Sequence, residues 1–157
     1  MTDTAPPSPA ARPKAIVLLR LLSLFYDLWP MVAIWMLLSA LFNLGFYLAG
    51  HDRREILDTF SPLGLLLWLC CLLATAAYAV LSWARGGQTL GMRPWRLRVT
   101  GIDGAPATRA QLLRRFGFGL LSLLPAGLGF WWAWFDRDRL AWHDRLSGTR
   151  MMRAAKR

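Results

Sequence analysis

Two charged side chains, Arg20 and Asp27, stand seven residues apart at the start of a long apolar stretch. In a helix this spacing places them ~20° apart around the axis and ~10 Å along it, so they share one stripe. An ionised carboxylate in lipid costs ~2.5–3.5 kcal/mol on insertion scales, so Asp27 should face protein, a partner cation or a water-filled cavity. The pair indicates either a proton- or cation-binding site or a buried ion pair that fixes helix orientation.

Other chemically capable residues do not form a recognisable catalytic or metal centre. His143 lies beside Asp144, but the chain has only two histidines, which cannot supply a four-ligand zinc site. We therefore expect His143 to be a surface or hydrogen-bonding residue. The sequence GGQTLG lacks the spacings of phosphate-binding loops, so its glycines are expected to form turns. The serines have no evident base at hand. We predict no enzyme, no metal and no cofactor.

Three apolar segments must position these side chains: residues 21–49, 63–83 and 116–135. The first would extend ~43 Å as a helix, more than the ~30 Å hydrocarbon core, so we expect tilt or a kink at Pro30. The second is long enough to span once. The third contains the helix-breaking sequence LPAGLGF at its middle. The sequence predicts an all-α membrane protein with two spanning helices and a third, broken segment that either re-enters or spans.

The distribution of basic residues predicts the topology. The chain is 55% hydrophobic yet carries a net charge of +10, so apolar runs and charges must be segregated. Seven basic residues lie in each of the stretches 84–115 and 136–157, but only two in 50–61. The positive-inside bias places the N-terminus and both basic stretches in the cytoplasm, which favours a re-entrant or interfacial third segment. Nucleic acid is not a predicted partner, because it would leave the apolar runs unexplained.

A small basic module is predicted between and after the apolar segments. Residues 95–99 alternate apolar and basic side chains, as a half-buried strand does, and a turn at Asp103-Gly104 should end it. Thr108 is expected to cap a helix beginning near Arg109.

The C-terminal part of this module is predicted to be a short helix and a strand. Asp136 is expected to cap a helix that runs through Leu146 and ends at Gly148. Residues 149–152 would then form a strand paired with residues 95–100.

The order of these features resembles the RDD family of bacterial membrane proteins. The resemblance rests on Arg20 and Asp27 in the first apolar segment, GQTLGMRPWRLRVTGIDG after the second, and WFDRDRLAWHDRLSGT after the third. The arginine and two aspartates that name the family map to Arg20, Asp27 and Asp144. The resemblance covers residues 16–152, which leaves a disordered N-terminal tail, 1–15, and a basic C-terminal tail, 153–157. It implies a multi-pass protein of the cytoplasmic (inner) membrane, with transport of unknown ligands as the usual suggestion.

Two functions are consistent with this sequence. In the first, the protein is a transporter or ion-translocating subunit in which Asp27 binds a proton or cation. Two or three helices cannot enclose a pathway, so transport would require a homo-oligomer. In the second, it is a membrane scaffold or accessory subunit, with Arg20, Asp27 and Asp144 as a structural lock. The residues then expected to contact anionic lipid head groups or a partner membrane protein are Arg93, Arg96, Arg98 and Arg145.

Overall fold

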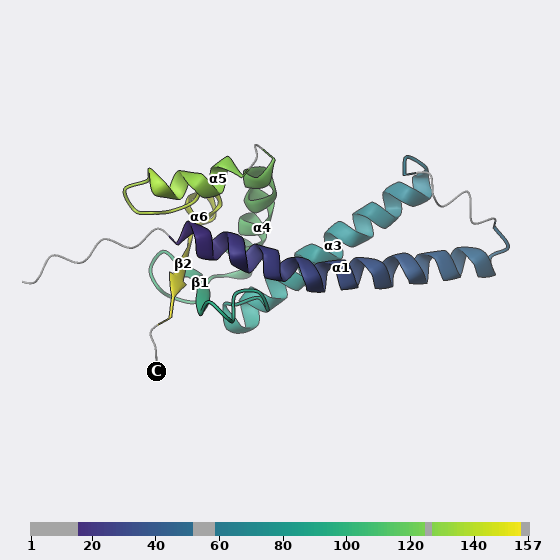
Figure 1. Cartoon of the computed structure of the whole chain (residues 1–157), viewed down its shortest axis with the longest axis horizontal. Coiled ribbons are helices and arrows are strands. Elements are labelled where there is room, and N and C mark those ends of the chain that lie inside the picture. Colours follow the sequence, from purple (N-terminus) through teal and green to yellow (C-terminus); the bar gives the residue numbers. More distant parts are fainter. Residues whose placement is uncertain (1–15, 52–58, 125–126, 155–157) are drawn as a thin grey trace, which may run out of the picture.

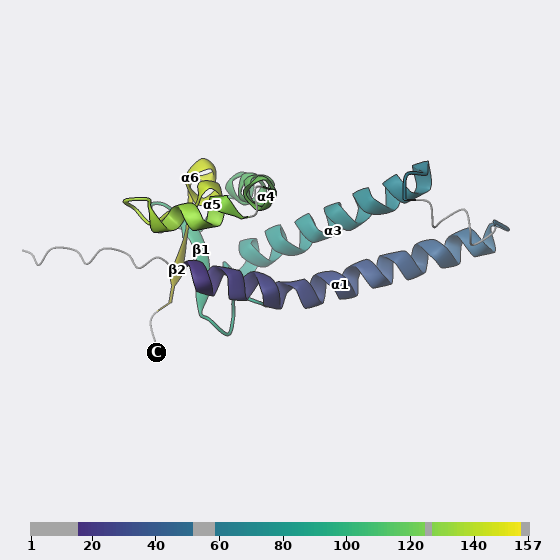
Figure 2. The same ribbon diagram turned by 45° about the horizontal axis from the view of Figure 1, so that its top comes forward.

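Two long apolar helices that cross at an angle dominate the structure (Figure 1), a computed structural model that describes residues 16–51, 59–124 and 127–154. The helices are α1 (Val17–Leu48) and α3 (Pro62–Gly86), with mean hydropathies of 1.9 and 2.2 over their most apolar windows (Figures 1 and 2). Both are long and apolar enough to cross a membrane. The two predicted spanning helices are thus confirmed.

One face of the first eleven residues of α1 packs against protein, whereas nearly all of the remaining residues are at least partly exposed. Its buried side chains are those of Val17, Arg20, Ser23 and Asp27, followed only by Phe46 near the far end. Residues 28–48 would extend ~31 Å, which matches the thickness of the hydrocarbon core. Helix α1 continues through Pro30 as one helix, and the tilt or kink that we expected from its excess length stays a prediction. Asp27 lies where the packed part ends.

Helix α3 has well-formed ends and contacts α1 through a polar pair. Ser61 caps its start by accepting a hydrogen bond from the Gly64 N–H at 3.0 Å, and Gly87 ends it with φ at 68°. Midway along, the Trp35 indole N–H donates to the Thr75 hydroxyl at 2.9 Å. Both helices otherwise present large exposed apolar side chains outward, as lipid-facing helices do.

The predicted pairing of two short strands is confirmed. Strand β1 (Leu97–Gly101) runs antiparallel to β2 (Thr149–Arg153), with Val99 opposite Met151. We expected β1 to begin two residues earlier, but Arg96 has a φ of 55° and belongs to the preceding turn. Strand β2 extends to Arg153, the first residue we had assigned to the C-terminal tail.

The third apolar segment forms a bent pair of helices. Helix α4 (Arg109–Leu123) begins at Thr108, whose hydroxyl accepts from the Gln111 N–H, as predicted. Helix α5 (Leu128–Trp131) continues into the 3₁₀ turn η1 (Trp132–Trp134). Between α4 and this continuous α5–η1 stretch the chain bends by 110°. Residues 125–126 of the predicted break lie outside the described residues. The expected break in this segment is thus confirmed.

Close approach across this bend requires a glycine. A Cβ on Gly129 would lie 2.6 Å from the Ser122 Cβ, so no larger residue fits there without a shift. In Figures 1 and 2, α4 runs crosswise to α1, near the end where α1 begins. The third segment therefore does not lie alongside the two long helices as a straight third span.

The C-terminal helix is shorter than expected. Helix α6 comprises Trp142–Ser147, and Gly148 ends it with φ at 66°, as predicted. Our prediction that Asp136 caps this helix was wrong. The Asp136 carboxylate instead accepts from the backbone N–H groups of Asp138 and Leu140 at 3.2 and 3.1 Å, which closes a turn ahead of the helix.

The short elements gather at one end of the α1–α3 pair, where they form a compact module with its own core. Buried in this core are Val80, Met92, Leu97, Val99 and Leu112. Ile16 and Leu19 from the start of α1 pack against the same cluster as Met151 of β2. The start of α1, the end of α3 and strand β2 therefore share one end of the helix pair (Figure 1).

Candidate functional site

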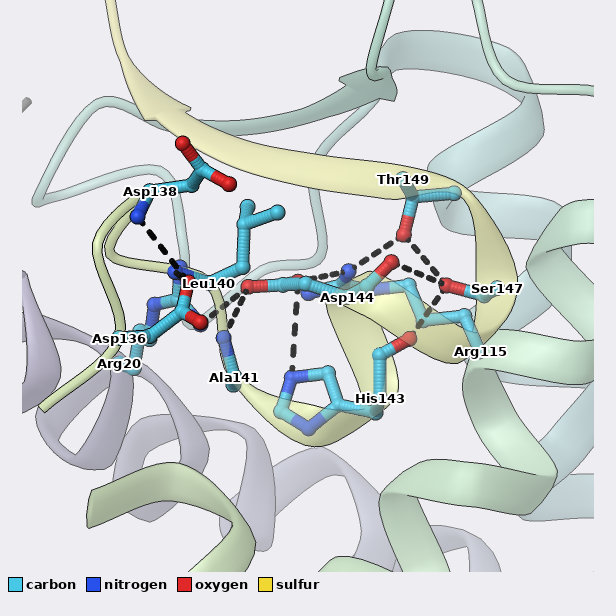
Figure 3. A network of polar contacts seen from close by, with 10 residues as sticks. All are labelled: Arg20, Arg115, Asp136, Asp138, Leu140, Ala141, His143, Asp144, Ser147 and Thr149. Carbon is cyan, nitrogen blue, oxygen red and sulfur yellow. Dashed lines mark hydrogen bonds and ion pairs between the residues drawn. The ribbon is translucent and has the colours of Figure 1, made fainter. Parts of the chain in front are cut away.

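Asp144 of α6 is fully buried and links three helices. One carboxylate oxygen accepts from the Arg20 guanidinium of α1 and the other from the Arg115 guanidinium of α4 (Figure 3). The backbone N–H of Ala141 also donates to Asp144, at 3.1 Å. Arg115 donates in addition to the Thr149 hydroxyl at the start of β2, at 2.7 Å. This Asp144 cluster therefore connects α1, α4, α6 and β2 at one point.

The two guanidiniums keep Asp144 ionised. Burial alone would raise the pKa of this carboxyl, but the charges of Arg115 and Arg20 outweigh it and hold the pKa well below its usual range. The three side chains together carry a net charge of +1. Such a buried group is stabilising only while its partners remain in place, because an unpaired buried charge is strongly unfavourable.

His143, beside Asp144, is buried and neutral. The residue is 3% exposed, so of our two expectations, a surface residue or a hydrogen-bonding residue, the first was wrong. Burial, reinforced by the charge of Arg115, lowers its pKa to about 3. The ring packs on Phe130 with 4.6 Å between centroids, and its Nε2 lies 3.7 Å from Asp144, beyond hydrogen-bond distance. Its Nδ1 atom has no hydrogen-bond partner among the described residues.

Asp27 is held by neutral donors rather than by arginine. Its carboxylate accepts from the Tyr78 hydroxyl at 2.8 Å, the Thr89 hydroxyl at 2.5 Å and the Gly91 N–H at 2.8 Å. No basic side chain in the described part of the chain forms an ion pair with it. The Asp27 site thus attaches the loop after α3 to the first helix.

Gly91 permits this attachment because the loop backbone touches α1. A Cβ at this position would lie 2.2 Å from the Ser23 carbonyl oxygen and 2.7 Å from the Asp27 nitrogen, both backbone atoms. Our interpretation of Gly91 as a turn residue did not include this contact. Gly87, by contrast, does serve as the terminating residue of α3.

The structure thus separates the three predicted charged residues into two sites. It brings Arg20 and Asp144 together across 124 positions of sequence, whereas Asp27 lies in the other site. Besides the backbone contact of Gly91, sequence reasoning missed three side chains that bind the two aspartates: Arg115, Tyr78 and Thr89. Arg115 had a detectable signal, since an arginine at the start of an apolar segment needs an acidic partner.

The four arginines expected at lipid head groups or a partner are exposed and lie outside both sites. Arg145 is 57% exposed and forms ion pairs with Asp136 at 3.0 Å and Asp138 at 3.3 Å. The others lie in the loop before β1 and on the outward side of β1: Arg93, Arg96 and Arg98. Their accessibility permits contacts with anionic groups.

A cavity lies between the two sites. It is lined by residues of α1, α3, α4 and α5, of α6 and β2, and of the loop after α3, and has a volume of about 170 Å³. Its wall is almost entirely apolar, with Arg20, Asp27, Arg115 and His143 as the ionisable residues that line it. Within the described residues, no cluster of side chains suits a metal ion.

The fold is that of a helical membrane protein. Two helices are long and apolar enough to cross a membrane, a third apolar segment is bent, and buried charges join these helices to a small module with a two-stranded sheet. The model of the RDD family, a family of membrane proteins, matches residues 14–148, so the chain belongs to the RDD family. No curated protein and no solved structure matches it.

Proposed function

We propose that the protein is a non-enzymatic membrane scaffold or accessory subunit in which Arg20, Asp27 and Asp144 form a structural lock. The observation that carries this proposal is the complete burial of Asp144 between two guanidiniums from different helices. Both arginines are matched by the same carboxylate, and Asp27 separately fixes the loop after α3. These contacts support a role in holding the module against the membrane helices.

We further propose that the module faces the bacterial cytoplasm. The start of α1 and strand β2 share one end of the helix pair, and the basic stretches 84–115 and 136–154 belong to that end. The positive-inside bias then supports a cytoplasmic N-terminus and C-terminus in the inner membrane. The exposed residues Arg93, Arg96, Arg98 and Arg145 are suited to anionic head groups or a partner protein.

A second candidate function is proton or cation translocation by an oligomer. It is favoured by Asp27, a buried carboxylate at the cavity wall whose contacts in the described structure are all neutral. Carboxylates within membrane helices mark ion pathways and proton relays in other membrane proteins. The largely exposed apolar face of α1 is available to a second copy of the chain or to lipid.

Flux measurements on the Asp27→Asn variant distinguish the two functions. Wild-type protein and variant are reconstituted in liposomes, and proton, sodium and potassium fluxes are recorded with size-exclusion profiles. The scaffold function predicts no flux above that of empty liposomes for either protein. Ion translocation predicts flux in the wild type and its loss in a normally assembled variant. Wild-type flux of any of these ions would overturn the scaffold proposal.

A further inference from the structure

Three buried hydrogen-bonding atoms without partners belong to residues that line the cavity. They are Nε of Arg20, Nε1 of Trp83 and Nδ1 of His143. The described part of the chain contains only two other such side-chain atoms, on Trp95 and Thr100, and neither residue lines the cavity. A buried polar atom without a partner is costly, so this concentration needs an explanation.

The chemistry of these atoms indicates what would satisfy them. The Arg20 and Trp83 nitrogens carry N–H groups and can only donate, whereas the His143 nitrogen donates or accepts according to its tautomer. All three residues adjoin the Asp144 cluster or its partners: Arg20 binds Asp144, His143 precedes it, and the Arg115 guanidinium lies 5.5 Å from the Trp83 ring. A group rich in acceptor oxygens matches this end of the cavity.

The charge near the cavity indicates which kind of acceptor group the ligand carries. The Asp144 cluster has a net charge of +1, which favours an oxyanion over a neutral carbonyl. Asp27, the acidic residue that lines the cavity, lies seven residues after Arg20 on α1, or ~10 Å away by helical rise. An oxyanion at the Arg20 end is therefore separated from the Asp27 carboxylate.

The rest of the cavity suits an alkyl chain. Its wall beyond the charged end includes Leu24, Ala79, Phe116 and Leu123. Pockets that enclose a whole drug-sized ligand measure ~300–1,000 Å³. This cavity is smaller, and its lining includes Leu120 and Leu123, which are also exposed on the surface of α4. It would therefore hold a head group and the start of a chain that continues past these two leucines.

We propose that this cavity binds an anionic amphiphile, with a carboxylate or phosphate head group at Arg20, Trp83 and His143 and its alkyl chain leaving past α4. Both a free fatty acid and a phospholipid with one chain supply this chemistry. The site is independent of the scaffold function, which would stand if no amphiphile bound.

Gly119 provides a direct way to fill the cavity. It lines the space, and a Cβ at this position meets no atom within 4 Å. Gly119→Leu would therefore place a side chain in the cavity without a backbone clash. Gly117→Leu is a matched control, because Gly117 lies on the same helix, has the same open surroundings and does not line the cavity.

A second pair of variants tests the head-group contact. Trp83→Phe removes an N–H donor from the cavity wall while retaining an aromatic ring. Trp95→Phe removes a donor that is equally buried and unpartnered but outside the cavity. Neither substitution alters the charged residues of the Asp144 cluster.

Binding is measured with the full chain in a neutral detergent, using radiolabelled palmitate, 1-palmitoyl lysophosphatidate and, as the uncharged probe, 1-palmitoyl glycerol. We expect at least one anionic probe to bind at least tenfold more tightly than palmitoyl glycerol. Gly119→Leu should weaken this binding at least tenfold and Trp83→Phe about threefold, with both controls unchanged. The tighter of the two anionic probes identifies the source of the head group.

Three results would overturn the proposal: no binding of either anionic probe, equal binding of palmitoyl glycerol, or wild-type affinity in Gly119→Leu. Should Gly119→Leu fail to give a monodisperse protein, the Trp83→Phe and Trp95→Phe pair decides. Equal affinities in that pair would then exclude the head-group contact.

Discussion

The two buried aspartates of this membrane protein are held by opposite means. Asp144 is buried between two guanidiniums that come from α1 and α4, whereas Asp27 accepts from two hydroxyls and one backbone N–H. The first site depends on charge and joins distant parts of the chain. The second depends on close backbone approach and needs no charge on its donors. Similar burial of one residue type thus gives two sites that should respond differently to mutation and pH.

The largest effect should come from removing the charge of Asp144. In Asp144→Asn two buried arginines lose their shared counter-ion, so the free energy of unfolding should fall by about 3–5 kcal/mol. Thermal and chemical unfolding in detergent would measure it. Asp138→Asn is the control, because Asp138 is 60% exposed and its ion pair should contribute little. An Asp144→Asn protein as stable as the control would show that the cluster does not hold the module.

At the Asp27 site, backbone contact should matter more than charge. Gly91→Ala would introduce a Cβ that overlaps two backbone atoms of α1, so the loop must move and the hydrogen bonds of Thr89 and Gly91 are lost. We expect a loss of about 3 kcal/mol in the free energy of unfolding. Gly86→Ala is the matched control, since a Cβ there meets no atom within 4 Å. Equal stabilities of these two variants would mean that the loop does not touch α1.

As the pH is lowered, the free energy of unfolding should fall first because of His143, the buried neighbour of Asp144. The folded protein holds the pKa of His143 at about 3, against a usual value of 6.5, so the unfolded chain binds the extra proton between these values. The contribution of His143 to the free energy of unfolding is therefore fully present above pH 6.5. It falls by about 2 kcal/mol as the pH is lowered from 6.5 to 5. The depressed pKa of Asp144 adds a further loss only below the usual pKa of an aspartate, about 3.9.

This pH dependence is tested by comparing slopes rather than absolute stabilities. In His143→Gln the decline between pH 6.5 and 5 should disappear, whatever the stability of the variant at pH 7. His51→Gln serves as the control, because His51 is exposed and is no part of the Asp144 cluster. A slope that persists in His143→Gln would assign the acid sensitivity to another group.

The sequence allowed the helices to be predicted better than the charge pairs. Segment length and hydropathy were sufficient for α1 and α3, and local signals such as Thr108 and Gly148 located the ends of α4 and α6. Alternation of side chains indicated the paired strands. These features depend on residues near one another in sequence, which periodicity and turn chemistry describe well.

The contacts of the two aspartates depend on the tertiary arrangement instead. Helical spacing placed Arg20 and Asp27 on one stripe, but it did not show that Arg20 would pair with Asp144 while Asp27 accepted from Thr89 and Gly91. Hydropathy also placed Asp27 inside the first apolar segment, because the packing of the module along the start of α1 is not visible in a hydropathy pattern. Asp136 was misassigned as a cap for a related reason: its own turn competes for the same carboxylate.

The smallest effect should come from Asp27→Asn. The amide retains an oxygen that can accept from Tyr78 and Gly91, and the Thr89 hydroxyl can rotate to accept from the new NH₂ group, so all three contacts are replaceable. We expect a loss of about 1 kcal/mol in the free energy of unfolding, as for one weakened hydrogen bond. Tyr78→Phe, which removes a single donor, should cost a similar amount. If Asp27→Asn were instead as damaging as Asp144→Asn, Asp27 would need its charge in the folded state, and the two aspartates would stabilise the protein by the same means.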